Sequence, residues 1–280
     1  MKKTSKLLGI FLIFMLFSIY PLLAQEKENP MYLTVTTMHW NMDQEDFSMK
    51  DWKAVEKEFL DKVTSKNEYI LATNYGLHHM TADNTELVYV QLYKSWSDIE
   101  KAGEKNSELI KAAWPDKTKR EAYFKKRSAY YADKHSDEIY VTMSGAKQRA
   151  EVSNDPVLFY VRKSHFAFSE EGTDKEFNEL RDGFLKEVIH KNQYIKGYYP
   201  YAHAWGSDRR DYVEVFVVNS LADLEKALEE MGNLNKARFK NKADQKTWDK
   251  KVAKYFTGYH GDYVYKSVPE LAKSSSVPKK

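Results

Sequence analysis

The chain has no cysteine among its 280 residues, and this absence excludes several kinds of protein at once. No disulfide can staple its domains, and no cysteine is present for lipoprotein processing. The sequence also lacks a glycine-rich phosphate loop, a nucleophile elbow and a cluster of ligands at zinc spacing. Hydrolase and nucleotide-binding functions are therefore weakly supported, and we expect no metal site.

The segment 1–24 has no acidic residue, and its pattern is typical of a secretory signal peptide. Three lysines precede an apolar run, and the chain turns polar at Gln25. An uncleaved membrane anchor is the alternative, because the run is close to the shortest length that spans a bilayer. Pro21 and Ala24 favour cleavage over an anchor. We therefore expect an exported protein, periplasmic or extracellular, that is free of the membrane once the signal is cleaved.

Beyond the signal segment the chain has no net charge. The three lysines of the signal account for the whole excess of 44 basic residues over 41 acidic ones. A neutral surface offers no electrostatic attraction for nucleic acid or for an anionic membrane. We expect neither of them as a partner.

The most informative feature that is present is an internal repeat. Residues 59–140 align without a gap on residues 184–265, with about a third of the positions identical. Identical pairs include Phe59 and Phe184, Asn67 and Asn192, His78 and His203, and Tyr140 and Tyr265. Loops change in length faster than cores, so a gap-free repeat that crosses several loops indicates two copies of one compact unit.

Both copies show the same order of elements. Alternating apolar residues predict strands, and apolar residues at helical spacing predict helices. In the first copy we expect a strand, a helix, a hairpin, two helices and a last strand, at 32–40, 52–67, 69–80 with 86–93, 97–113, 117–132 and 138–143. The second copy has matching strands at 157–165, 194–205 and 211–218. This βαββααβ order predicts an α+β fold with an antiparallel sheet and helices on one face.

The pattern resembles the dimeric α+β barrel superfamily, in which two ferredoxin-like units pack sheet to sheet. A closer similarity is to its NIPSNAP-type members, whose third strand leads into a charged helix pair with an aromatic residue near the start of the second helix. The residues that carry the likeness are Val88, Val90, Trp96, Asp98, Glu121, Tyr123 and Tyr130, and in the second copy Val213, Val215, Asp223, Trp248 and Tyr255. The resemblance implies two tandem repeats that form an intramolecular α+β barrel.

The repeat divides the chain into two domains. We expect a signal peptide at 1–24, ferredoxin-like repeats at 31–143 and 156–267, a polar linker at 144–155 and a flexible tail at 268–280. Each domain is long enough to bury its own core. The sequence leaves open a monomer with an internal pseudo-dimer and a homodimer.

The hairpin strands carry the candidate site residues. If the first hairpin turns just after Asp83, His78 lies beside Tyr89. Gln91 then shares their face, which is expected to look toward the sister sheet. Val88 and the alternate apolar residues of its strand are expected to face the helices.

The second hairpin would place His203 beside Glu214, together with Tyr201 and Tyr212. A histidine beside a glutamate among aromatic rings is a candidate acid/base pair, because burial shifts their pKa values. The pair exists only in the second half, because Tyr89 stands at the position of the glutamate in the first.

Several alternatives stay open for these residues. Arg162 joins His203 and Glu214 in only one of the two phases that the apolar pattern of its strand allows. The two repeated histidines are also explained as core residues that are hydrogen-bonded to a strand neighbour. The H-x-D sequences at 135–137 and 260–262 are explained as turns, because two ligands do not make a metal site.

We infer an exported protein that binds a small apolar or aromatic ligand between its two sheets, or a structural protein of the same fold, with no cofactor. The lining would comprise His78, Tyr89, Gln91, Tyr201, Tyr212 and Arg162, beside His203 and Glu214. The superfamily resemblance implies an enzyme as the alternative, namely a cofactor-free or haem-dependent monooxygenase or isomerase with His203 as base or axial ligand. A scaffold protein that uses exposed sheet edges is a third hypothesis, since one fold hosts many functions.

Overall fold

The computed structural model describes residues 29–150 and 154–274. The first half contains β1 (Tyr32–His39), α1 (Met49–Lys62), β2 (Ile70–Met80), β3 (Glu86–Tyr93), α2 (Trp96–Ala113), α3 (Lys117–Ser128) and β4 (Ser136–Thr142). The second half contains β5 (Leu158–Phe166), α4 (Asp174–Phe184), β6 (Gly197–Trp205), β7 (Asp211–Val218), α5 (Leu221–Ala237), α6 (Lys242–Ala253) and β8 (Phe256–Ser267). Three short helices follow α1, α4 and β8, namely η1 (Thr64–Lys66), η2 (Leu185–Ile189) and η3 (Pro269–Leu271). Each half is a βαββααβ unit, as predicted.

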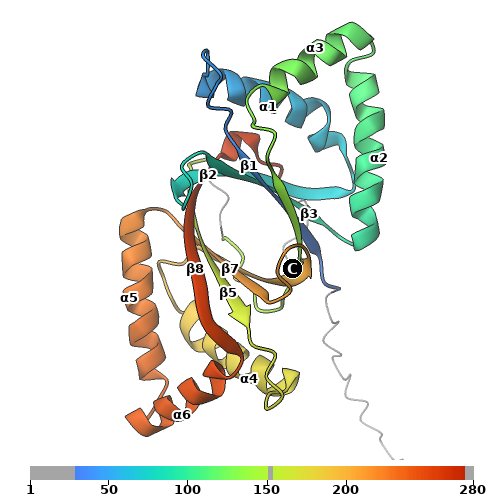
Figure 1. The fold of residues 1–280 in the computed structure, drawn as a ribbon. Coiled ribbons are helices and arrows are strands. Elements are labelled where there is room, and N and C mark those ends of the chain that lie inside the picture. The colour runs from blue at the N-terminus through green and yellow to red at the C-terminus, as the bar shows by residue number, and fades with distance from the viewer. Residues whose placement is uncertain (1–28, 151–153, 275–280) are drawn as a thin grey trace, which may run out of the picture.

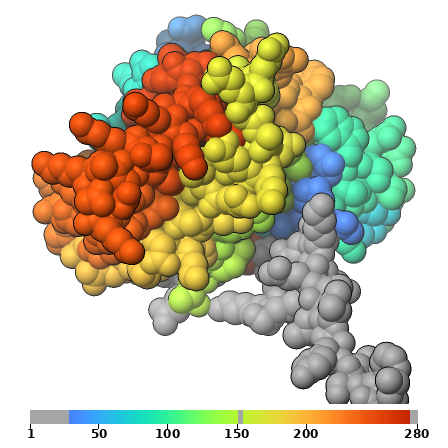
Figure 2. Space-filling view, turned by 90° about the horizontal axis from the view of Figure 1, so that it is seen from below, coloured from blue at the N-terminus to red at the C-terminus, as the bar shows by residue number. Residues whose placement is uncertain are grey.

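The eight strands form one closed barrel in the order β1-β3-β2-β8-β5-β7-β6-β4. Neighbouring strands are antiparallel, and the two four-stranded sheets join where β2 pairs with β8 and where β4 pairs with β6. Figure 1 looks along this barrel, with α1, α2 and α3 outside one sheet and α4, α5 and α6 outside the other. In Figure 2, from below, the second half (yellow to red) directly abuts the first (blue to green). The predicted intramolecular α+β barrel is therefore confirmed.

Local signals explain where several helices begin. The side chains of Ser48, Thr173 and Ser220 each accept a hydrogen bond from the backbone N–H three residues ahead. Such a cap satisfies a helix N–H group that has no partner inside the helix. Helices α1, α4 and α5 therefore begin where their sequences provide a capping hydroxyl.

A buried asparagine occupies the same place in each half. The amide nitrogen Nδ2 of Asn67 donates to the carbonyl oxygen of Ala102 at 2.9 Å, and Nδ2 of Asn192 donates to that of Ala227 at 2.8 Å. Both asparagines are fully buried. Each one ties the turn after the first helix of its unit to the following long helix, so the sequence repeat is also a repeat of specific contacts.

The packed core of each half lies between the helices and the outer surface of the barrel. In the first half, Trp52 of α1 packs with Tyr75 of β2 and Leu87 of β3. In the second half, Ile189 of η2 packs with Tyr198 of β6 and with the neighbouring strands. The helix-facing side of each sheet therefore contributes buried aromatic side chains to this core.

The face assignment predicted for the first hairpin is wrong. Tyr75, and not His78, lies opposite Tyr89, while Gly76 lies opposite Val88. The turn takes up more residues than predicted and shifts the pairing by an odd number, which exchanges the two faces of a strand. Tyr89 consequently packs against the helix-facing core. Val88, on the other face, points into the barrel.

The second hairpin shows the same correction. Pro200, and not His203, lies opposite Glu214, and Tyr201 lies opposite Val213. Glu214 therefore shares the helix-facing surface, whereas His203 and Tyr201 face the barrel interior. The predicted acid/base pair of His203 with Glu214 does not form, because the sheet separates the two side chains.

The segment that follows β8 is not a flexible tail as far as it is described. Val268 and Leu271 are buried in the core of the first half. The backbone of Lys273 exchanges hydrogen bonds with that of Thr73 in β2. The C-terminal segment of the second unit thus closes the core of the first, while residues 275–280 lie outside the described part.

No helix in the described part of the chain combines the length and the apolar character needed to cross a bilayer. The predicted signal peptide at 1–24 lies outside the described residues, so export stays a prediction. The domain boundaries at 31–143 and 156–267 and the oligomeric state also stay predictions.

Candidate functional site

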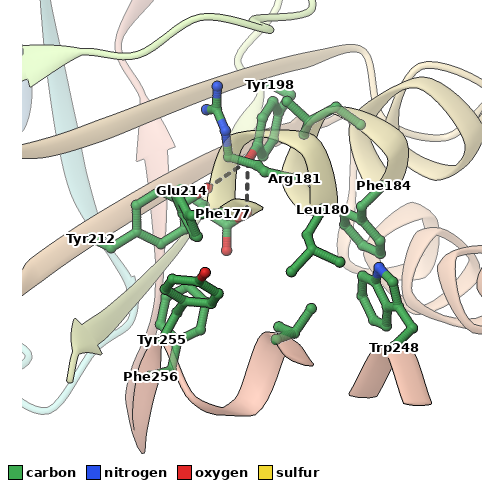
Figure 3. Close-up of a pocket in the computed structure, with 12 residues that line it drawn as sticks. Phe177, Leu180, Arg181, Phe184, Tyr198, Tyr212, Glu214, Trp248, Tyr255 and Phe256 are labelled. Carbon is green, nitrogen blue, oxygen red and sulfur yellow. Dashed lines mark hydrogen bonds between the residues drawn. The ribbon is translucent and has the colours of Figure 1, made fainter. Parts of the chain in front are cut away.

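A cavity opens in the second half between the outer surface of the barrel and the helices α4 and α6 (Figure 3). Its volume is about 170 Å³. The lining comprises Phe177, Leu180, Arg181, Phe184, Leu185, Tyr198, Tyr212, Glu214, Trp248, Val252, Tyr255 and Phe256. An engineered protein cavity of about 150 Å³ binds benzene. The space is therefore sufficient for one six-membered ring.

The only carboxylate among the lining residues is that of Glu214, in the middle of β7. The hydroxyl of the fully buried Tyr198 donates to Oε1 of Glu214 at 2.6 Å, and the hydroxyl of Tyr212 lies 3.3 Å from that of Tyr198. Burial raises the pKa of Glu214 above its usual 4.5, against the opposing effects of the Tyr198 hydrogen bond and of the charges of Arg162 and Arg181. The carboxyl group is thus easier to protonate than one in water.

The tyrosines around Glu214 remain protonated. Burial, and next the charge of Glu214, raise the pKa of Tyr198 well above 10. The same two causes raise the pKa of Tyr212. Both hydroxyls therefore act as neutral hydrogen-bond donors over the whole physiological range, and Glu214 is the group in this cluster that can exchange a proton.

Two N–H donors of the lining residues have no hydrogen-bond partner. The two terminal nitrogens of Arg181, on α4, donate to the backbone oxygen and to the hydroxyl of Ser144, at 3.0 and 2.6 Å. Its Nε has no hydrogen-bond partner. The indole Nε1 of Trp248 is also buried and unpartnered. Buried donors without partners are rare in folded proteins. They would suit a ligand that offers acceptor atoms.

The first half has a closed network in the corresponding space. The carboxylate of Glu56, on α1, accepts from Nε and Nη2 of Arg127 at 2.8 and 2.9 Å. The hydroxyls of Tyr75 and Tyr131 each donate to the same carboxylate at 2.8 Å, and Trp52 Nε1 donates to Tyr131 at 2.8 Å. Glu56 is 3% exposed. Every polar group of this network therefore has a partner.

The repeat alignment shows how the two halves differ in this space. Continued to residue 52 at the same offset of 125 residues, the repeat alignment pairs Arg127, Tyr131 and Trp52 with Val252, Phe256 and Phe177. The large polar residues that fill the first half are thus replaced by smaller or purely apolar ones that line the cavity. The acid has also moved, because Arg181 stands where the first half has Glu56 and Glu214 stands where it has Tyr89.

The predicted site residues fall on both faces of the sheet. Glu214 and Tyr212 line the cavity, and Arg162 lies opposite Glu214 on the neighbouring strand, where its Nη2 donates to the hydroxyl of Tyr160 at 2.9 Å. The other five lie elsewhere. His203 and Tyr201 face the barrel interior on β6, His78 lies near the end of β2 with its ring against Thr81, and Tyr89 and Gln91 share the helix-facing surface of the first half.

Sequence reasoning missed Arg181, Tyr198 and Trp248. A signal was present, because the alignment, continued at the same offset, pairs Arg181 with Glu56, a reversal of charge at a helix position that contacts the sheet. A buried position that changes charge between two copies requires different partners in each copy. The aligned pair therefore marked the place where the two halves differ.

The cavity does not fit haem, the cofactor implied for some members of the superfamily. Haem iron is held by histidine, cysteine, methionine or tyrosinate. The lining residues include no histidine, cysteine or methionine, and the raised pKa values of Tyr198 and Tyr212 oppose a tyrosinate. His203, the predicted axial ligand, lies on the other side of the sheet. The absence of a cofactor nevertheless stays a prediction.

No protein-family model matches the chain, and no curated protein matches it. Solved structures do match. A putative monooxygenase from Fusobacterium nucleatum subsp. nucleatum ATCC 25586 aligns with a TM-score of 0.51 at 11% identity, over 85% of this chain and 93% of its own. A putative monooxygenase from Lactobacillus acidophilus NCFM aligns with a TM-score of 0.52 at 5% identity, over 88% and 96%.

A mutant chlorite dismutase from Candidatus Nitrospira defluvii, in complex with cyanide, aligns with a TM-score of 0.51 at 12% identity, over 86% of this chain and 92% of its own. At these identities the likeness concerns the fold. The chain thus has the dimeric α+β barrel fold in a single chain, and the closer likeness to NIPSNAP-type proteins is not confirmed.

Proposed function

We propose that the protein is an enzyme that moves a proton on a small ring compound held in the cavity of its second half. The observation that carries the proposal is the contrast between the halves. Where the first half neutralises Glu56 with Arg127 and two hydrogen-bonded tyrosines, the second half has Glu214 at the wall of a cavity. A buried carboxyl group with a raised pKa, at the wall of an aromatic cavity, is typical of an acid/base site.

The cavity indicates the class of substrate. A volume of about 170 Å³ holds one six-membered ring, and a surrounding of Phe177, Phe184 and Phe256 favours a flat, apolar one. The unpartnered N–H groups of Arg181 and Trp248 favour a carbonyl or hydroxyl group on that ring. We therefore infer a monocyclic ketone, enol or phenol.

The chemistry follows from these groups. The ionised carboxylate of Glu214 takes a proton from the carbon next to the ring carbonyl and returns it to the same or to another carbon. Tyr198 keeps its own proton and holds the carboxylate in place. Negative charge that develops on the ring oxygen is stabilised by N–H donors at the wall of the cavity. The solved neighbours with enzyme names support an enzyme over a scaffold protein, although they do not indicate the reaction.

Cyclohexanone in deuterium oxide is a direct probe, because it is one ring with one carbonyl and its exchange with solvent is followed by NMR. The protein is expected to accelerate deuterium uptake, and Glu214→Gln is expected to abolish the acceleration by removing the base. Val252→Trp should abolish it as well by filling the cavity. Ala243→Trp is the matched control, because it adds the same ring to the exposed side of α6.

Binding is measured separately with phenol by ligand-observed NMR on the same variants. One outcome is that phenol binds to the parent and not to Val252→Trp, while the exchange of cyclohexanone is not accelerated. The protein would then be a binding protein that uses the same cavity, and not an enzyme. If neither compound binds to the protein, or if Val252→Trp binds phenol as well as the parent does, the proposed site is wrong.

A further inference from the structure

Three side chains of the second half converge at one end of the barrel, on the face of the sheet opposite to the cavity. They are His165 at the end of β5, Asp211 at the start of β7, and Asp208 in the turn before it. The imidazole Nε2 of His165 lies 3.5 Å from Oδ2 of Asp208 and 3.6 Å from Oδ1 of Asp211. One nitrogen or oxygen atom of each residue lies within 4.8 Å of the other two.

The local fold fixes this arrangement. His165 and Asp211 are direct partners in the pairing of β5 with β7. The backbone N–H of Asp211 donates to the carbonyl oxygen of Asp208 at 3.2 Å, which holds the turn against the start of the strand. The three residues are therefore brought together by strand register and by a tight turn, and not by flexible surface side chains.

One atom of the cluster has no partner. The side chain of Asp211 is 1% exposed, and its two oxygens have different surroundings. Oδ2 accepts from the hydroxyl of Tyr140 at 3.1 Å and lies 2.8 Å from Nζ of Lys163, whereas Oδ1 has no hydrogen-bond partner. A buried carboxylate oxygen without a donor is costly. Oδ1 is also the oxygen that faces His165, so the acceptor atom without a hydrogen bond lies on the side of the cluster.

We propose that His165, Asp208 and Asp211 form a binding site for a divalent first-row metal ion, for which Zn²⁺ is the representative. Zinc binds nitrogen and carboxylate oxygen at about 2.0–2.2 Å, so ligand atoms in a tetrahedral site lie about 3.3–3.6 Å apart. The separations of 3.5 and 3.6 Å are close to that value. An imidazole with two carboxylates is a donor set for ions of intermediate softness, and three protein ligands leave coordination positions for water.

Two cations next to the cluster oppose the metal ion and determine how it binds. Lys163 is bound to Oδ2 of Asp211 and also lies 3.3 Å from Glu138, so its charge is shared between two carboxylates. Arg210 is bound to both oxygens of Asp208, with Nη2 2.6 Å from Oδ2. The side chain of Arg210 is 47% exposed and can turn outward. Arg210 is therefore the group that a metal ion displaces.

The first half contains a related cluster that serves as an internal control. His39 lies opposite Glu86 in the strand pairing, as His165 lies opposite Asp211. However, Nδ1 of His39 is 3.2 Å from both Asp83 and the hydroxyl of Thr85, and Glu86 accepts from the hydroxyl of Tyr265. Glu86 therefore has a hydrogen-bond donor, whereas Oδ1 of Asp211 has none. His39, Asp83 and Glu86 thus do not offer a metal ion the same set of ligand atoms. The first half is therefore not expected to bind the ion.

The test is a calorimetric titration of chelator-treated protein with Zn²⁺, in a background in which the exposed His135 and His260 are both replaced by alanine. Those two histidines lie 3.3 and 3.2 Å from Asp137 and Asp262 and could otherwise take up zinc at the surface. One Zn²⁺ per chain is expected. His165→Ala should lower the affinity at least tenfold, and His39→Ala should leave it within twofold of the background.

Two further variants make the result specific. Asp211→Asn keeps the shape of the side chain and should also lose the ion, which covers the case that His165→Ala fails to fold. Arg210→Gln removes the competing guanidinium and should raise the affinity. Co²⁺ should give visible absorption bands that vanish in Asp211→Asn. No saturable binding, equal affinity in the background and in His165→Ala, or an equal loss in His39→Ala would each overturn the proposal.

Discussion

Arg127 and Val252 occupy aligned positions in the two halves of the molecule, and the difference between them separates a closed core from an open cavity. Arg127 holds Glu56 with two hydrogen bonds at 2.8 and 2.9 Å. Val252 has no polar atom to offer and lines the cavity beside Glu214. The first half thus has a buried ion pair, whereas the second half has an acid at the wall of a cavity.

Glutamine substitutions at the two acids should affect stability very differently. Glu56→Gln leaves the guanidinium of Arg127 without its counter-charge in a buried network, which should cost about 3–5 kcal/mol. Glu214→Gln keeps an oxygen that can accept from Tyr198 and should cost less than about 1.5 kcal/mol. Urea unfolding of both variants measures the difference. Equal losses would mean that the two halves do not differ in the way the structure indicates.

The stability of the protein should depend on pH through Glu214. Burial raises the pKa of this group above its usual 4.5, so the folded state binds its proton more tightly than the unfolded state does. The associated stability is fully present below about pH 4.5 and is lost as the pH rises through the folded pKa. The free energy of unfolding, measured from pH 4 to pH 8, should therefore fall less steeply in Glu214→Gln than in the parent. Parallel curves would contradict the raised pKa.

Gly76 is expected to be intolerant of a side chain at the junction of the two sheets. A Cβ at this position would lie 2.9 Å from Cγ2 of Val88 and 3.0 Å from Cβ of Tyr265. Gly76→Ala should therefore cost about 1–3 kcal/mol through overpacking. Gly103→Ala is the matched control, because it lies in α2 with no atom within 4 Å of the added group and should stabilise the helix by about 1 kcal/mol. Thermal unfolding of both variants distinguishes the two effects, and similar shifts would rule out a tight junction.

The two buried asparagines should contribute about equally to stability. Asn67→Ala and Asn192→Ala each remove three hydrogen bonds, one of which runs to the carbonyl group of a long helix. Each change should cost at least about 1–3 kcal/mol. Chemical denaturation of the two variants should give free energies of unfolding within about 1 kcal/mol of each other. A much larger loss on one side would show that the two halves are not energetically equivalent at this contact.

The succession of helices and strands could be predicted from the sequence, because it depends on local periodicity. The strand predicted at 86–93 coincides with β3 (Glu86–Tyr93), and the one at 211–218 coincides with β7 (Asp211–Val218). The gap-free repeat predicted two equal units, and their closure into one barrel followed from the family resemblance. These features rest on which residues are apolar and at what spacing, and both are visible in the chain itself.

The faces of the hairpin strands could not be predicted in the same way. They depend on how many residues each turn takes up, and an error of an odd number exchanges the two faces of a strand. The prediction that His203 meets Glu214 was wrong for this reason, and the cavity was expected inside the barrel when it lies outside. Periodicity gives the two sets of alternating residues, but it does not say which set faces the helices.

The sequence by itself determined the duplication, the order of the elements and the identity of Glu214 as an unusual acid, because each of these is a property of aligned or regularly spaced residues. Only the tertiary structure decided which groups surround that acid. Tyr198, Arg181 and Trp248 come from β6, α4 and α6, and the cluster of His165, Asp208 and Asp211 depends on the pairing of β5 with β7. Contacts between distant segments are set by packing and register, which no local pattern of residues encodes.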